Sequence, residues 1–177
     1  MGKKDFDRML DQKQKKDQSI DWKRLKSDWI DYVSQLYNFV EKCLESYIQT
    51  GKVQVRREHK SITEESIGTY RIEKAAIEIG NDTIVLEPIG ILIIGAFGRV
   101  DIKSLLGTAT LVLVPDVSTK PRIGVSVYGL EEERERTEAE QKVWKISTEP
   151  PNISYLELTE DRFFDIIVEL LGGEATF

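Results

Sequence analysis

The spacing of apolar residues predicts one long helix near the N-terminus. From Trp22 to Tyr47, large apolar side chains recur at steps of three and four, which places them on one broad helical face. Ser19 suits the N-cap position and Gly51 suits the position after the last turn, so the predicted helix spans 19–51. At 1.5 Å per residue, such a helix extends roughly 45 Å and exceeds the width of a small domain. We therefore expect part of its apolar face to contact another protein.

The first 18 residues carry few apolar side chains. Lys, Gln and Asp dominate the segment, and only Phe6, Met9 and Leu10 are large and apolar. Because this composition buries little surface, we expect 1–18 to be flexible or a frayed helix.

After Gly51 the period of the pattern changes to two, which indicates β-strands. A polar connection is predicted at 60–66, where the alternation stops. In the segment 69–79 the apolar positions change parity, which predicts a β-bulge at Ala75 and Ala76.

Further strands are predicted at 83–87, 91–103, 108–114, 122–128, 141–147 and 155–158. The connections between them are short, and short connections favour antiparallel hairpins because a parallel crossover needs a dozen or more residues. The Glu-rich segment 131–140 predicts a solvated loop or a short exposed helix.

Thr159 is a suitable N-cap for a final helix, and the pair of acidic residues after it favours a helix start. We therefore expect an α+β fold, in which a long N-terminal and a short C-terminal helix pack on a bent, mainly antiparallel sheet of six to eight strands. The predicted domain spans 19–177, with the first helix at 19–51, the sheet at 52–158 and the last helix at 159–172.

Charge is distributed unevenly along an otherwise ordinary globular composition. The chain of 177 residues is 40% hydrophobic, with a formal net charge of -6. Residues 1–60 carry 14 basic and 10 acidic side chains, a net +4, whereas residues 61–177 carry 11 and 21, a net -10. The acidity of the second part argues against nucleic-acid binding, which depends on clustered Lys and Arg.

The chain contains one cysteine, Cys43, and one histidine, His59. These counts exclude an intramolecular disulfide and a zinc site built from Cys and His, so both residues are expected to be structural. The longest apolar run, 89–97, is too short to span a membrane, and no signal-peptide pattern is present. We expect a cytoplasmic protein with no membrane association and no bound metal.

Charged residues alternate at the end of the predicted strand 91–103. Arg99, Asp101 and Lys103 occupy every second position, so they share one face of the strand. This cluster is a candidate partner-binding surface. The long helix supplies the other candidate partner-binding residues, which are Trp22, Trp29 and Leu36.

The same strand end also permits an enzymatic hypothesis. The order of acidic and basic residues resembles that of nucleases of the restriction-endonuclease type: Glu41 or Glu45 on a helix, Glu87 at a strand end, and then Asp101-x-Lys103. In that order two carboxylates bind Mg²⁺ and the lysine orients a water molecule. A helix follows the D-x-K strand in such nucleases, whereas 105–114 predicts a turn and another strand.

Two functional hypotheses follow from these patterns. The first is a non-catalytic protein-binding or assembly module, such as a small subunit, an inhibitor or an immunity-like protein, without a cofactor. Its partner would be another protein, or a second copy in a homodimer, bound through the N-terminal helix. The second hypothesis is a metal-dependent hydrolase or nuclease that uses Glu87, Asp101 and Lys103 with Mg²⁺.

Overall fold

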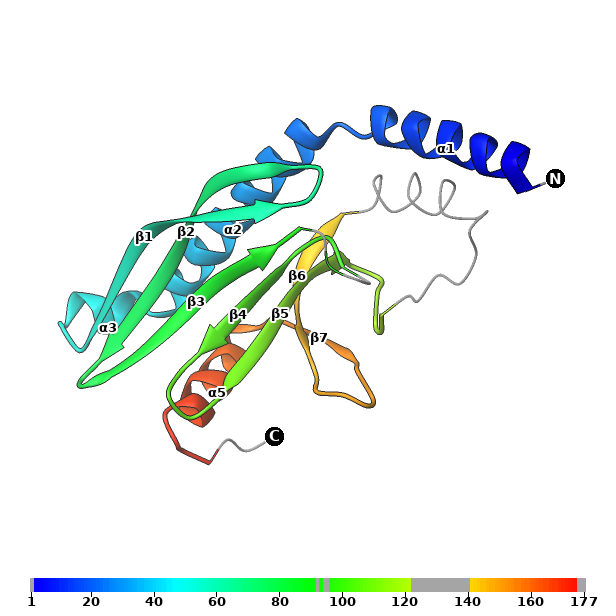
Figure 1. Cartoon of the computed structure of the whole chain (residues 1–177). Helices are drawn as coiled ribbons and strands as arrows, with labels where there is room; N and C mark the ends of the chain where they lie inside the picture. The colour runs from blue at the N-terminus through cyan, green and yellow to red at the C-terminus, as the bar shows by residue number, and fades with distance from the viewer. Residues whose placement is uncertain (1, 92, 94–95, 122–140, 175–177) are drawn as a thin grey trace.

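A computed structural model describes residues 2–91, 93, 96–121 and 141–174 of the chain (Figure 1). Its helices are α1 (Gly2–Ser19), α2 (Trp22–Cys43), α3 (Glu45–Gln49) and α5 (Glu160–Leu170). Its strands are β1 (Val53–Glu64), β2 (Gly68–Ile79), β3 (Asp82–Gly90), β4 (Arg99–Lys103), β5 (Thr108–Pro115), β6 (Lys142–Ser147) and β7 (Tyr155–Glu157). The predicted strand at 122–128 and the predicted Glu-rich segment at 131–140 lie outside the described residues.

In the described part of the chain, seven strands form one sheet. The strand order is β1-β2-β3-β4-β5-β6-β7, and every adjacent pair is antiparallel. Short connections explain this order, because a hairpin returns the chain beside the strand it has just left. The prediction of an antiparallel sheet of six to eight strands is therefore confirmed.

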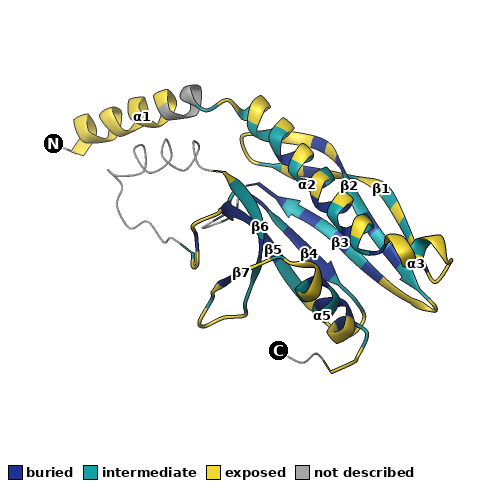
Figure 2. Ribbon diagram, turned by 180° about the vertical axis from the view of Figure 1, so that it is seen from behind, coloured by how far each residue is buried: buried dark blue, intermediate teal, exposed yellow. Residues whose placement is uncertain are grey.

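The helices α2 and α5 cover the same face of the sheet (Figures 1 and 2). They also touch each other, since the rings of Phe39 and Phe163 lie 6.2 Å apart between centroids. One hydrophobic core joins both helices to the sheet, and its members include Trp29, Leu36, Tyr37, Ile77, Leu86, Ile102, Leu111, Phe163 and Leu170. The helices α2 and α5 each bury one apolar face against the sheet, which is the arrangement of an α+β domain and confirms the predicted fold class.

The helix predicted at 19–51 is divided in the structure. The carboxylate of Asp21 accepts a hydrogen bond from the backbone N–H of Arg24 at 3.0 Å, so Asp21 rather than Ser19 caps α2. Residues 2–19 form the separate helix α1, and α3 follows α2 after a one-residue break. Gly51 follows α3 with a φ of 75°, a left-handed conformation that glycine adopts without strain.

The first two strands form a longer hairpin than the sequence predicts. Pairing runs without interruption from Val53 opposite Ile79 to Glu64 opposite Gly68, so neither the connection at 60–66 nor the bulge at 75–76 exists. The change of apolar parity has another cause. Strand β2 pairs with β3 only over its last five residues, where Ala75 and Ile77 are the buried side chains. In the preceding part of β2, the buried side chains are Tyr70 and Ile72, which lie on the opposite face of the strand.

The predicted long strand at 91–103 is also shorter in the structure. Strand β3 continues to Gly90, the register shifts between Pro88 and Gly90, and β4 begins only at Arg99. Backbone hydrogen bonds hold the end of the intervening segment beside β5, with Phe97 N–H donating to Leu113 O at 2.7 Å. Alternation of apolar residues therefore misplaced the start of β4, because Phe97 and Gly98 make backbone hydrogen bonds to β5 without belonging to a strand.

Candidate functional site

A charged network lies on the face of the sheet opposite α2 and α5. Glu87 on β3 and Asp101 on β4 are direct cross-strand partners. Their neighbours in the chain, Leu86 and Ile102, are fully buried against the helices, so the two carboxylates point to the other face. We call Lys60, Glu87, Arg99, Asp101 and Lys103 the charged network.

Arg99 holds Asp101 through two hydrogen bonds. The guanidinium Nε lies 2.7 Å from Asp101 Oδ1, and the second nitrogen lies 3.2 Å from Oδ2. Asp101 is only 6% exposed, so this bidentate pair neutralises a carboxylate that has little access to water. Asp101 therefore stabilises the sheet face rather than presenting a free charge to solvent.

Two lysines hold Glu87. Lys60 Nζ, from β1, lies 2.8 Å from Glu87 Oε1, and Lys103 Nζ lies 3.3 Å from Oε2. The hydrogen bond from Lys60, followed by that from Lys103, lowers the pKa of Glu87 below its ordinary value, against the opposing effect of partial burial. Lys60 also donates to the carbonyl oxygen of Pro88 at 3.1 Å, which ties the β1–β2 hairpin to β3.

The geometry of this network bears on the metal-dependent hypothesis. The structure brings Glu87, Asp101 and Lys103 together, but Lys103 binds Glu87 and Asp101 binds Arg99. A divalent cation would have to displace these cationic side chains before it could share both carboxylates. Within the described ranges, no group of three or more His, Cys, Asp and Glu side chains is placed to hold a metal ion.

The three partner-binding candidates of the long helix have different environments. Trp29 and Leu36 are each 1% exposed and pack in the core of the chain itself, so neither is accessible to a partner in this fold. Trp22, in the first turn of α2, is partly exposed. The chain's own sheet therefore covers the apolar face of the helix over most of its length. The length of the predicted helix does not indicate a partner-binding surface at Trp29 or Leu36.

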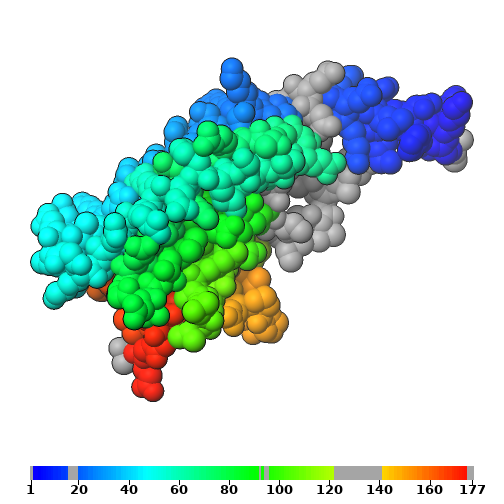
Figure 3. Space-filling model, turned by 60° about the vertical axis from the view of Figure 1, so that its left-hand side comes forward, coloured from blue at the N-terminus to red at the C-terminus, as the bar shows by residue number. Residues whose placement is uncertain are grey.

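A surface that the sequence analysis did not select lies on α1. The side chains of Phe6, Met9 and Leu10 are 56%, 53% and 43% exposed, and we call them the α1 triad. Figure 3 shows α1 extending away from the body of the molecule, and none of the α1 side chains whose burial is described, residues 2–15, belongs to the hydrophobic core. The spacing i, i+3, i+4 in the first 18 residues was the available signal.

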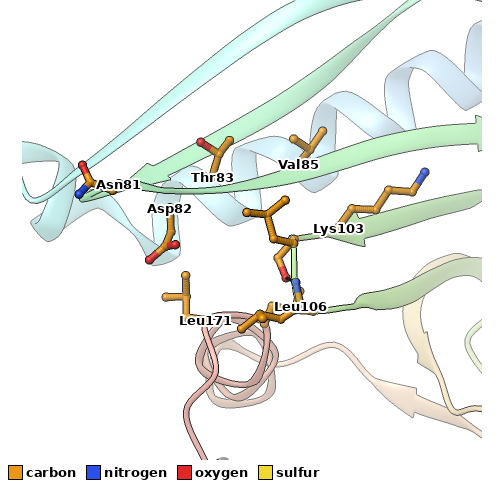
Figure 4. Close-up of a pocket in the computed structure, with 10 residues that line it drawn as sticks. Asn81, Asp82, Thr83, Val85, Lys103, Leu106 and Leu171 are labelled. Atoms are coloured by element: carbon orange, nitrogen blue, oxygen red, sulfur yellow. Dashed lines mark hydrogen bonds between the residues drawn. The ribbon is translucent and has the colours of Figure 1, made fainter.

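A second exposed apolar surface lies at the opposite end of the molecule. Leu105 and Leu106, in the β4–β5 turn, are 101% and 69% exposed. Together with Leu171 they form what we call the leucine patch. It borders a pocket of about 390 Å³ whose other wall is the β2–β3 turn, where Asp82 points toward Leu171 (Figure 4).

His59 and Cys43 take no part in these surfaces. His59 is exposed on β1. Cys43 is partly buried beside the core, and burial raises the pKa of its thiol, which disfavours the reactive thiolate.

Comparison with known proteins identifies no relative of the chain: no family model, no curated protein and no solved structure matches it. Among the helices of the described residues, none combines the length and apolar character needed to cross a membrane.

Proposed function

We propose that the protein is a non-catalytic protein-binding or assembly module and that α1 presents its partner-binding face. The observation that carries this proposal is the exposure of the α1 triad, Phe6, Met9 and Leu10. Single exposed apolar residues are ordinary on protein surfaces. Three of them at the spacing i, i+3, i+4 form one continuous stripe, which is how amphipathic helices enter the grooves of their partners.

The isolation of α1 supports the same proposal. All of its described side chains, from residue 2 to residue 15, are exposed. Helices of this length are marginal in water on their own, because most helical stability in proteins comes from packing of an apolar face. A partner that covers the α1 triad would supply the packing that the described residues of the body do not provide.

The charged network fits a structural role within this proposal. Every carboxylate of the network is paired with a cation, and its hydrogen bonds link β1, β3 and β4. Arg99 and Lys103 remain 38% and 41% exposed, so their outer surfaces are still available as secondary contacts for a partner. We retain a cytoplasmic location in this proposal because the lone cysteine requires no oxidising compartment.

A metal-dependent hydrolase is the second candidate, and one observation favours it. Glu87 and Asp101 lie side by side on neighbouring strands, with Lys103 on the same face. Such a site would need Lys60 and Arg99 to move aside when the metal binds. The structure supports the binding module better, because the α1 triad is accessible without rearrangement.

Affinity capture with the full-length tagged chain tests the proposed function. The test variant carries Phe6→Gln and Leu10→Gln, which remove the apolar stripe while keeping good helix formers. The matched control carries Asp11→Gln and Lys15→Gln, which change the opposite face of α1 and leave the net charge unaltered.

We expect the wild-type chain and the control to retain the same protein from an extract of the cells that make it. The test variant should retain at least about tenfold less, roughly 1.4 kcal/mol of binding free energy. An untagged second copy of the chain counts as a retained protein. Retention that is equal for the test variant and the control would refute the role of α1.

A further inference from the structure

We propose that the α1 triad of one copy docks on the leucine patch of a second copy, so that the chain assembles head to tail. This inference rests on the proposed function, since it names the chain itself as the partner of α1. Within the part of the chain that the structure describes, two apolar surfaces are exposed to solvent. One is a convex helical stripe, and the other borders a pocket.

The leucine patch has the character of a binding surface rather than of ordinary exposed residues. Leu105 and Leu106 follow each other at the tip of a hairpin and stand 101% and 69% exposed. The pocket beside them is lined by Leu170 and Leu171 of the C-terminal helix segment and by Val85 of β3. Contiguous apolar surface around a hollow is characteristic of sites that bind another apolar group.

The charges around the two surfaces are complementary. On α1, Lys3 precedes Phe6 by three residues and Lys13 follows Leu10 by three, so cations lie on the same helical face at both ends of the triad. The pocket beside the leucine patch is lined by exposed Asp82 and by Lys103, whose ammonium group already lies 3.3 Å from Glu87 Oε2. Two further exposed acidic residues, Glu169 and Glu174, lie close in sequence to Leu170 and Leu171. A helix docked on the patch would therefore bring Lys3 and Lys13 toward carboxylates.

The same charges disfavour pairing between two α1 helices. An antiparallel pair that placed Phe6 opposite Leu10 of the other helix would also place Lys3 opposite Lys13. A parallel pair would place each lysine opposite its own counterpart. Because like charges at close range oppose association, the leucine patch is the better site for the triad.

The arrangement of the chain makes docking intermolecular. The helix α1 and the C-terminal helix α5 lie at opposite ends of the molecule (Figures 1 and 3). A contact between two different surfaces is heterologous, so it closes into a ring or continues as an open chain of copies. The interface is small, and we expect association to be weak and to increase with protein concentration.

Light scattering on the purified full-length chain tests this inference, with the variants Leu106→Asp for the patch and Phe6→Gln with Leu10→Gln for α1. Val117→Asp is the matched control, because Val117 is also an exposed turn residue, at 68%, but lies outside the patch. Circular dichroism of each variant establishes that the fold is retained.

The average mass measured for the wild-type chain and for the Val117→Asp control should rise above the monomer mass of 20.3 kDa as protein concentration increases. Each of the two test variants alone should stay at the monomer mass. An equimolar mixture of the two should reach at most twice that mass, because one variant retains α1 and the other retains the patch.

Three results would overturn the inference: a wild-type chain that is monomeric at every concentration, a Leu106→Asp variant that associates like the wild type, or a mixture that remains monomeric. A monomeric wild type leaves the capture experiment unaffected, so failure of self-assembly is distinguishable from failure of the proposed function.

Discussion

The indole ring of Trp29 occupies the space that a β-carbon at residue 98 would need. Gly98 is buried at the end of the segment that precedes β4, and three carbon atoms of the Trp29 ring are its nearest neighbours in that direction. The same ring lies 5.9 Å from the ring of Trp144 on β6, measured between centroids. The start of β4, and with it the position of Arg99, therefore depends on a glycine that lets α2 approach the sheet closely.

Replacing Gly98 by alanine should destabilise the fold. A β-carbon at this position forces Trp29 to move within a packed core, and overpacking of this kind costs about 1–3 kcal/mol. Urea denaturation followed by tryptophan fluorescence measures the change in free energy of unfolding. Gly107→Ala is the control, because the nearest atom to its β-carbon would be 3.7 Å away, an ordinary contact. Equal stabilities of the two variants would contradict this account.

The pairing of Glu87 should make stability depend on pH. Its pKa is lowered in the folded protein by Lys60 and Lys103, so its contribution is present above the unfolded value of about 4.3 and is lost as pH falls through the lower folded value. Glu87→Gln should cost about 0.5–1 kcal/mol at pH 7, a small value because the ion pairs are partly exposed.

Denaturation of the wild type and of Glu87→Gln at pH 7 and at about pH 3 checks this dependence. The difference between them should shrink at the lower pH, because the contribution of a lowered pKa declines once pH falls below the unfolded value of about 4.3. Glu65→Gln, at an exposed position of the β1–β2 turn, should show little difference at either pH. A difference for Glu87→Gln that is constant or larger at low pH would contradict the assignment.

Asp101 should act as a structural partner of Arg99 and not as a metal ligand. Asp101→Asn removes the charge from a buried bidentate pair and should cost about 1–3 kcal/mol of unfolding free energy. Adding Mg²⁺ to the wild type should leave its melting temperature unchanged. A Mg²⁺-dependent rise that disappears in Asp101→Asn would instead support the hydrolase hypothesis.

The hydroxyl of Tyr37 should contribute measurably to the core. It donates to the carbonyl oxygen of Glu73 at 2.8 Å and lies 3.3 Å from that of Leu86, which joins α2 to β2 and β3. Burial raises its pKa above the ordinary value, so the donor proton is retained at neutral pH. Tyr37→Phe should lower the free energy of unfolding by about 1 kcal/mol. No change in a urea titration would show that water satisfies these carbonyls equally well.

The sequence predicts the architecture well because periodicity reports which face of each element is buried. The turn predicted at 104–107 placed the strand 108–114 close to the observed β5, and the helical spacing of Phe163 and Leu170 led directly to α5. Periodicity could not show that only the last five residues of β2 pair with β3. A strand that changes its buried face and a strand with a bulge both produce a change of apolar parity, so the pattern at Ala75 does not distinguish them.

The candidate surfaces were harder to predict for a related reason. A sequence shows that Trp29 and Leu36 are on an apolar face, but only the sheet shows that the chain itself covers them. The shared face of Arg99, Asp101 and Lys103 followed from alternation, and Arg99 pairs with Asp101 within the same strand. The contacts of Lys60 and Lys103 with Glu87 depended on pairing across strands, which the sequence does not show. The α1 triad was visible in the sequence at the spacing i, i+3, i+4, but residues 1–18 were expected to be flexible or a frayed helix, so the triad was not selected as a surface.

Site-specific photocrosslinking from α1 in the cells that make the protein tests the central claim most directly. The photoreactive phenylalanine analogue p-benzoylphenylalanine replaces Phe6 in one variant and Lys15, on the opposite face of α1, in the other. We predict a covalent protein adduct from position 6 and little or none from position 15. If the chain assembles head to tail, the adduct should contain Leu105 or Leu106 of a second copy. Absence of any adduct from position 6, or equal adducts from both positions, would contradict the claim that the α1 triad is the partner-binding face.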